Sequence, residues 1–310
     1  MKIRQSSLSI VILNWNGTHD TLNCLASLSH IESKDLTVQI VVIDNGSDID
    51  ETPEIQRAFP ETKMIRLPRN VGFAGGCNLG IREALVNGAD YILFLNNDTE
   101  VEPNFLTPLI AAVQENQRIG LACSCIKALD ESVEFAGANI NFATGSFKHL
   151  RRLEMDSSPV PTEYVTGCSM LVPVRILKAI GTFDEKLFSY FEDTDLSLRA
   201  QRAGFETVLV PESVVRHKGS ASTRRGLSEG TTSPLKHYLI ARNRIVIVKR
   251  YAPLAAKWFY LTISSPCRLA FYTAAFVVRK RWTKLRWFWR GVCDGFRGTL
   301  EMPEGLGSGE

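Results

Sequence analysis

Residues 91–103, YILFLNNDTEVEP, decide the fold. An apolar run without polar alternation ends abruptly in Asn96, Asn97 and Asp98, as expected of a strand that is buried on both faces. Runs of the same kind come earlier in the chain, at residues 8–13, 38–43 and 64–67. Helical patterns separate them, at residues 18–29, from Pro53 onward, and at 76–86. This alternation predicts an α/β protein with a mostly parallel central sheet covered by helices.

The predicted strands deliver polar side chains to one edge of the sheet. They end in residues 14–16 (NWN), 44–47 (DNGS), 69–70 (RN) and 96–98 (NND). Any one of these segments is equally well explained as a turn, because Asn, Asp and Gly are ordinary turn formers. Ligands of parallel sheets bind outside the carboxyl ends of the strands, so four such segments at one edge favour a binding site.

Composition and charge restrict the function further. The chain has 310 residues, of which 45% are hydrophobic, and this is enough for a full core. Its net charge of +3 does not indicate a nucleic-acid partner, and we expect none. Seven cysteines without CxxC spacing predict buried, reduced thiols. The N-terminal segment lacks the features of a signal peptide, so we expect a cytoplasmic protein.

Three groups of residues carry candidate chemistry. Asp98 offers a hard oxygen ligand for Mg²⁺ or Mn²⁺, and the less favoured alternative is a capping or turn role before Pro103. Glu192, Asp193 and Asp195 begin an amphipathic helix, and repulsion among three carboxylates can raise one pKa toward the range of a general base. The helix dipole accounts for at least one of these acids. His217 stands in a loop between basic residues, although a lone His is usually a surface or core residue.

The Gly-rich stretch 69–81, RNVGFAGGCNLGI, leads into a predicted helix and could present backbone N–H groups to an anion. It is not a Walker A loop, because Ile81 and Arg82 stand where Lys and Ser or Thr are required. It also lacks GxGxxG directly after a strand. Taken alone, it is a tight turn as readily as a binding loop.

Six motifs in this order resemble family 2 glycosyltransferases of the GT-A fold, in particular the bacterial rhamnosyltransferase-like and galactofuranosyltransferase-like branch. They cover residues 8 to about 220. The motifs are VILNWNG at 11–17, VVIDNGSD at 41–48, RNVGFAGGCN at 69–78, LFLNNDTEV at 93–101, TGCSMLVPVRIL at 166–177, and FDEKLFSYFEDTDLSLRAQRAG at 183–204.

The resemblance implies roles for individual residues. Asp98 corresponds to the last carboxylate of the family's metal-binding DxD motif, which reads Asn96-Asn97-Asp98 here, and His217 matches the position that completes the metal coordination. Asp193 matches the catalytic base. The residues implied to bind the nucleotide sugar or the acceptor are Asn14, Asn16, Asp44, Asn45, Arg69, Asn70, Gly75, Asn78, Asn97, Gly167 and Glu192.

The implied activity is inverting, metal-dependent transfer of a sugar from a nucleoside-diphosphate donor to a hydroxyl of a glycan or lipid-linked oligosaccharide, in cell-surface polysaccharide synthesis. Rhamnose is the preferred sugar, and a UDP-hexose or UDP-galactofuranose donor is the alternative. An inactive sugar-nucleotide-binding module remains a rival. A sugar-phosphate nucleotidyltransferase is disfavoured because Trp15 and Asn16 stand where its Gly-rich motif is required, and a polymerising synthase because no QxxRW motif is present.

The composition changes after about residue 230, so we expect a catalytic domain at 1–230 and a helical extension at 231–310. Within 256–290, Pro266 and Arg268 are expected to divide the apolar run into two stretches that are each too short to span a membrane. Basic residues alternate with tryptophans from 279 to 290, a pattern that suits an anionic membrane surface. A basic helix packed on its own domain is the alternative. We expect peripheral attachment to the inner face of the cell membrane.

Overall fold

The computed structural model describes residues 5–33, 36–152, 159–219 and 232–303. The chain forms two compact units. Unit 1 comprises Met1–Ala138, His149–Glu185 and Asp193–Ser220, and unit 2 comprises Asn139–Lys148, Lys186–Glu192 and Ala221–Glu310. The boundary that the sequence places near residue 230 lies outside the described residues.

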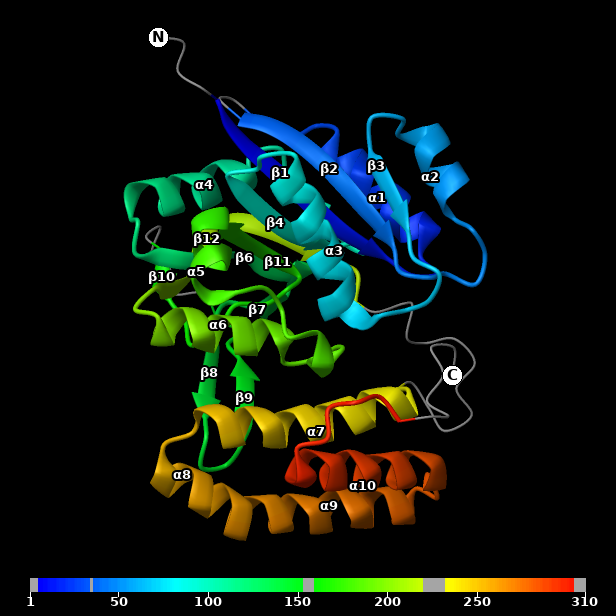
Figure 1. The fold of residues 1–310 in the computed structure, drawn as a ribbon, viewed down its shortest axis with the longest axis vertical. Coiled ribbons are helices and arrows are strands. Elements are labelled where there is room, and N and C mark those ends of the chain that lie inside the picture. The colour runs from blue at the N-terminus through cyan, green and yellow to red at the C-terminus, as the bar shows by residue number, and fades with distance from the viewer. Residues whose placement is uncertain (1–4, 34–35, 153–158, 220–231, 304–310) are drawn as a thin grey trace. The chain divides into compact units, whose positions relative to one another are not determined.

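Unit 1 is built on a mixed sheet around β1 (Ser6–Asn14) (Figure 1). β1 pairs in parallel with β2 (Leu36–Asp44) and with β4 (Tyr91–Asn96). Along the sheet the strand order is β10-β12-β6-β11-β4-β1-β2-β3. The other strands on this path are β3 (Lys63–Arg66), β6 (Ile119–Ala128), β10 (Val160–Pro161), β11 (Ser169–Pro173) and β12 (Glu206–His217). Short strands β5 (Thr99–Val101) and β7 (Val133–Phe135) pair with β12 and β6.

Helices cover this sheet because its central strands are apolar on both faces. They are α1 (Thr18–Leu28), α2 (Thr52–Ala58), α3 (Gly72–Val86), α4 (Leu106–Glu115), α5 (Val174–Ile180) and α6 (Glu192–Arg202). Helix α3 lies directly on β1, since a Cβ atom at Gly80 would stand 2.3 Å from Cγ1 of Val11. A Cβ atom at Gly76 would meet Leu13 at the same distance. The glycines of the 69–81 stretch therefore allow a helix and a strand to pack closely.

The predicted α/β architecture is confirmed, including the helices that end the chain. Strand β6 is buried from Ile119 to Ile126 and ends at Ala128. A separate two-stranded sheet consists of β8 (Ala138–Asn141) and β9 (Ser146–His149). The prediction of uniformly buried thiols is wrong for two cysteines, because Cys267 and Cys293 are exposed on helices whose buried faces lie elsewhere.

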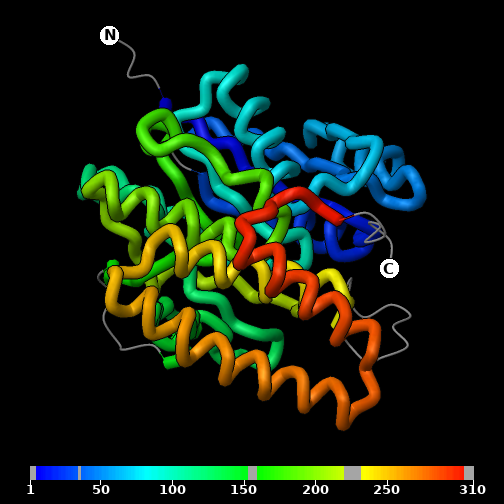
Figure 2. The backbone as a smooth tube through the Cα atoms, turned by 60° about the horizontal axis from the view of Figure 1, so that its bottom comes forward, coloured from blue at the N-terminus to red at the C-terminus, as the bar shows by residue number. Residues whose placement is uncertain are grey.

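Unit 2 consists mainly of α7 (Pro234–Tyr251), α8 (Leu254–Phe259), α9 (Ser265–Val278) and α10 (Trp282–Arg297). Figures 1 and 2 show α7, α10 and α9 side by side. Their shared core contains Ala241, Ile245 and Val248 from α7, Phe276 from α9, and Phe288 and Val292 from α10. The amphipathic pattern of α10 accounts for this packing, because its apolar residues recur on one face.

The expectation that Pro266 and Arg268 divide the apolar run is wrong. A π-helical turn at Tyr260–Ser264 joins α8 to α9, and Pro266 lies in the first turn of α9, where a missing N–H costs little. Leu254–Val278 is accordingly one continuous helical segment, and it alone among the described residues is long and apolar enough to cross a membrane.

Helix α7 also holds the segment that precedes α6. Arg242 is fully buried and donates to the carbonyl oxygens of Lys186 and Leu187 at 2.9 and 3.1 Å. The Asn243 amide donates to the carbonyls of Leu187, Ser189 and Tyr190 at 2.8–3.0 Å. Three residues of this segment, Phe188, Tyr190 and Phe191, have positive φ, which persists in non-glycine residues only where the surroundings enforce it. The hydrogen bonds from Arg242 and Asn243 hold the segment in this conformation.

Candidate active site

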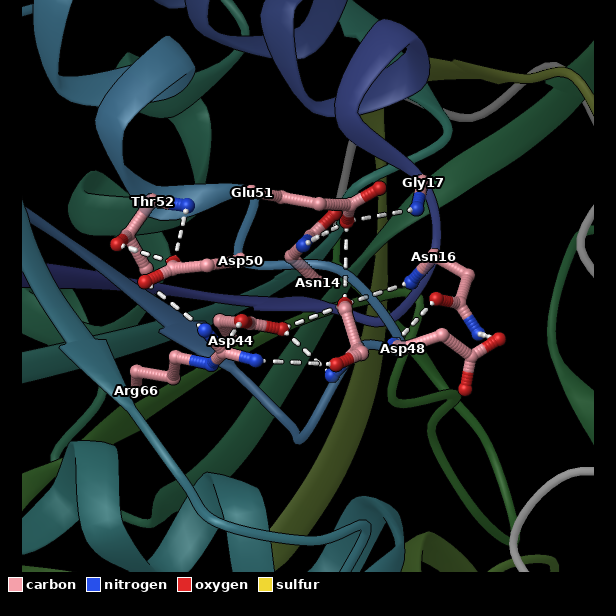
Figure 3. Close-up of polar contacts among 10 residues, drawn as sticks. Asn14, Asn16, Gly17, Asp44, Asp48, Asp50, Glu51, Thr52 and Arg66 are labelled. Carbon is pink, nitrogen blue, oxygen red and sulfur yellow. Dashed lines mark hydrogen bonds and ion pairs between the residues drawn. The ribbon is translucent and has the colours of Figure 1, made fainter.

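Buried polar contacts join the ends of β1 and β2 (Figure 3). Asn14 is fully buried, donates to Oε2 of Glu51 at 2.7 Å and accepts from the Thr21 hydroxyl at 2.7 Å. Glu51 also accepts from the backbone N–H of Gly17 at 3.2 Å. Asn14 thus links the first turn of α1 to the loop after β2, and its contact with a nucleotide stays a prediction.

Asn16 and Asp44 lie in the same network. Asn16 has φ 50°, a left-handed conformation that Asn tolerates, and its side chain exchanges hydrogen bonds with the backbone and carboxylate of Asp48. Asp44 is fully buried and accepts from the backbone N–H and hydroxyl of Ser47. Nε of Arg66 stands 3.4 Å from the Asp44 carboxylate. The loop after β2 is therefore held in one conformation.

Glu51 is a site residue that sequence reasoning missed. Although burial raises its pKa, donors from Asn14, Ser47 and Gly17 lower the pKa below the usual range overall. The carboxylate is therefore ionised at neutral pH. The sequence offers no clear signal for this role, because an acid beside a helix start is ordinary.

The residues expected around the Gly-rich stretch shape its loop. The Asn45 amide donates to Oδ1 of Asn70 and to the Gly72 carbonyl at 3.1 and 3.2 Å. Arg69 is exposed, and Gly75 lies in the first turn of α3 beside Val71. Asn78 faces a different segment, since its amide exchanges hydrogen bonds with the Phe183 backbone at 3.0 Å. Their binding roles stay predictions.

The pairing of β5 with β12 places Asp98 next to His217. Thr99 of β5 pairs with His217 of β12, and the backbone N–H of Lys218 donates to the carbonyl of Asp98 at 2.9 Å. As a result, Nε2 of His217 lies 3.2 Å from Oδ1 of Asp98. Asn97 points elsewhere, because its amide donates to the Thr21 hydroxyl at 3.0 Å.

Glu134 completes this cluster and was not predicted from the sequence. Its Oε2 lies 3.0 Å from Nδ1 of His217, since β7 and β12 both pair with β6. Burial lowers the pKa of His217, but hydrogen bonds and charge from Asp98 and Glu134 raise it to about 9. The ring is therefore fixed between two carboxylates, with Nε2 toward Asp98.

These residues fit a divalent cation that is shared with a substrate. A histidine that binds a metal through Nε2 usually donates its Nδ1–H to a carboxylate, as the Glu134 contact allows. Within the described ranges, no group of three or more His, Cys, Asp or Glu could hold a metal by itself. At such a site Asp98 and His217 would supply two ligands and diphosphate oxygens the others, as is common for Mg²⁺.

Asp193 stands at the start of α6 in a different environment. Oδ2 accepts from the backbone N–H of Gly167 at 3.2 Å, and Oδ1 accepts from that of Thr194 at 2.6 Å. Desolvation outweighs these donors and raises the pKa of Asp193. Asp195, in contrast, is buried in an ion pair with Arg199 at 2.8 Å. The raised pKa of Asp193 suits a proton acceptor.

Residues 9–181, more than half of the chain, match the family described as Glycosyl transferase family 2. The chain belongs to glycosyl transferase family 2. It is therefore a glycosyltransferase, as the motifs predicted, and its relatives place it with the rhamnosyltransferase-like members.

Two relatives illustrate this placement. The dTDP-rhamnosyl transferase RfbF of Shigella flexneri is 25% identical over 255 residues, which cover 80% of this chain and 82% of the relative. The N-acetylglucosaminyl-diphospho-decaprenol L-rhamnosyltransferase of Mycobacterium tuberculosis is 27% identical over 226 residues, covering 65% of this chain and 72% of the relative.

Solved structures show the same fold. GalNAc-T7 with UDP, GalNAc and Mn²⁺ superposes with a TM-score of 0.68 at 16% identity, over 98% of this chain and 59% of the other. The mannosyltransferase PcManGT of Pyrobaculum calidifontis, in complex with GDP-Man and Mn²⁺, superposes with a TM-score of 0.55 at 13% identity, over 94% and 87%. The predicted GT-A fold is confirmed.

Replacing Asp98 tests the metal site. Asp98→Ala removes the carboxylate that faces Nε2 of His217, so Mn²⁺ should no longer strengthen the binding of a nucleoside diphosphate. Isothermal titration of dTDP with and without Mn²⁺ measures this. A variant that keeps the wild-type Mn²⁺ effect would exclude Asp98 as a ligand.

Glu134→Gln is the companion variant, because it keeps the size of the side chain but weakens the hold on Nδ1 of His217. We expect the Mn²⁺ affinity to fall by roughly 10- to 100-fold, the usual effect of losing such an outer partner. Glu131→Gln, on the exposed turn before β7, is the control and should leave the affinity unchanged. Equal effects of the two variants would remove Glu134 from the account.

Proposed function

We propose that the protein transfers rhamnose from dTDP-rhamnose to a hydroxyl of a lipid-linked glycan by a single displacement with inversion, at the cytoplasmic face of the cell membrane. The observation that carries the reaction type is Asp193, a carboxylate with a raised pKa that two backbone N–H groups hold in place. The similarity to two rhamnosyltransferases supports the sugar. A UDP-hexose or UDP-galactofuranose donor is the alternative.

Asp193 acts on the acceptor in this proposal. Its carboxylate takes the proton of the attacking hydroxyl while the oxygen forms a bond to the anomeric carbon, and the nucleoside diphosphate leaves. The contact with Gly167 orients Oδ2. Bound at Asp98 and His217, Mg²⁺ or Mn²⁺ would neutralise the charge that develops on the diphosphate. Glu192, the residue before Asp193, is buried, and we assign it to substrate binding.

Substitution of Asp193 separates catalysis from binding. Asp193→Asn keeps the size of the side chain but cannot accept the proton, so kcat should fall by roughly 10²- to 10⁴-fold while dTDP affinity stays within about twofold. Product formation and dTDP titration measure the two quantities. Glu192→Gln is the matched neighbour and should reduce kcat less. If Asp193→Asn turned over like the wild type, the base would lie elsewhere.

The same residue sets the pH dependence. Because the base must be ionised and burial raises the pKa of Asp193, turnover of the wild type should disappear on acidification at a higher pH than an ordinary aspartate would give.

The membrane contact in this proposal rests on an exposed apolar surface of unit 2. The α8–α9 apolar face comprises Leu254, Trp258, Ile263, Phe271 and Val278, which are 50–81% exposed. Residues 279–281 (RKR) follow directly and can contact anionic headgroups. An exposed apolar stripe that ends in basic residues suits a helix lying in the membrane interface. Of the residues at 279–290 that the sequence suggested for the membrane surface, Lys284 and Phe288 are buried, whereas Trp282 and Trp289 are exposed.

Acidic substitutions test this surface. Trp258→Glu and Phe271→Glu should each weaken binding to phosphatidylcholine vesicles with 30% phosphatidylglycerol by about tenfold, because each aromatic side chain contributes about 1.5–3 kcal/mol on leaving water. Both side chains are exposed, so folding should persist. Val86→Glu, at an exposed position of unit 1, is the control. Equal sedimentation of all three variants with vesicles would rule out this surface.

A further inference from the structure

Unit 2 is strongly basic. Its described residues contain 16 Lys and Arg but only three Asp and Glu, namely Glu192, Asp294 and Glu301. Asp294 accepts from Arg290 and from the hydroxyl of Tyr238, both at 3.0 Å. Few acids are therefore left to neutralise the other cations of this unit.

Arg244 of α7 and Arg268 of α9 lack such neutralisation. The Nε atoms of both side chains are buried without a hydrogen-bond partner, and among the described residues neither arginine has an acidic partner. Burial and the positive charge of Arg268 together lower the pKa of Arg244. Two partly buried cations that repel each other destabilise the unit unless an anion shares them.

The surroundings hold both guanidinium groups in place. Arg268 donates to the carbonyl of Thr144, in the β8–β9 turn, at 2.9 Å. Arg244 stacks over the ring of Phe191, with Cζ 5.8 Å from the centroid, and that ring packs against Phe147 at 4.9 Å. Tyr260 closes the turn, because its ring lies so close to Gly145 that a Cβ atom there would stand 2.2 Å away. These contacts use few of the ten N–H groups of the pair.

We propose that Arg244 and Arg268 bind the diphosphate of the lipid-linked acceptor. The proposal rests on the proposed function, which supplies an acceptor held in a membrane. Arginine presents a planar set of donors that matches phosphate oxygens, and two arginines match two phosphates. In the sequence Arg268 lies on α9 between Ile263 and Phe271, so the pair of arginines and the α8–α9 apolar face belong to the same unit. A phospholipid headgroup also carries a phosphate, and the vesicle titration below distinguishes it from a lipid-linked diphosphate.

The test uses farnesyl diphosphate, a soluble isoprenoid diphosphate, titrated into the full chain in EDTA so that metal-dependent binding at Asp98 does not contribute. Arg244→Gln and Arg268→Gln should each weaken this binding by at least tenfold. Arg297→Gln removes an exposed charge from α10 and should change it less than twofold. Arg244→Lys keeps the charge and should recover part of the affinity, which a purely structural defect would not allow.

Titration of phosphatidylglycerol vesicles forms the second arm. If the Gln variants lose vesicle binding but keep farnesyl diphosphate binding, the site serves phospholipid headgroups and the proposal is overturned. Unchanged affinity in both arms also overturns it. Thermal unfolding identifies a variant that fails to fold. If one Gln variant does not fold, the binding result of the other Gln variant tests the proposal. Binding of farnesyl diphosphate requires no turnover. If the wild type bound this probe as expected but transferred no rhamnose, the proposed function would be contradicted and the binding site would not.

Discussion

The parallel pairing of β1 with β2 and β4 determines where the polar residues of unit 1 lie. Asn14 is opposite Asp44, and Leu13 is opposite Asn96, so the three strands end at nearly the same level. Because the interiors of these strands are largely apolar on both faces, their polar side chains gather where the strands end. The β5–β12 pairing then adds His217 beside Asp98 at the end of β4.

Local environment divides the carboxylates of this unit into two kinds. Glu51 accepts several hydrogen bonds, and its pKa lies below the usual range, so it stabilises a loop as a fixed anion. Asp193 accepts hydrogen bonds from the backbone of Gly167 and from the backbone and hydroxyl of Thr194, but desolvation outweighs them and raises its pKa. Two residues of the same chemical class therefore suit opposite tasks, one structural and one catalytic.

Much of unit 1 could be predicted from the sequence because its strands are continuous apolar runs and its turns carry characteristic polar residues. Asp98 was proposed from the end of such a strand and Asp193 from a group of acids at a helix start, and their roles stay predictions. Glu134 and Glu51 were not predicted, because each depends on pairing between segments far apart in the chain, and neither lies in a distinctive motif. The helix through Pro266 was also missed, because the π-helical turn that accommodates it has no sequence signature. Arg244 and Arg268 likewise become a pair only through the packing of unit 2.

The stereochemistry of the product tests the central claim most directly. With dTDP-rhamnose, Mn²⁺ and an N-acetylglucosaminyl-diphospho lipid, NMR of the purified product should show a new rhamnosyl linkage whose anomeric configuration is opposite to that of the donor. Such inversion follows from direct attack by a hydroxyl that Asp193 deprotonates. A product with retained configuration, or transfer from a UDP-hexose but not from dTDP-rhamnose, would contradict the account.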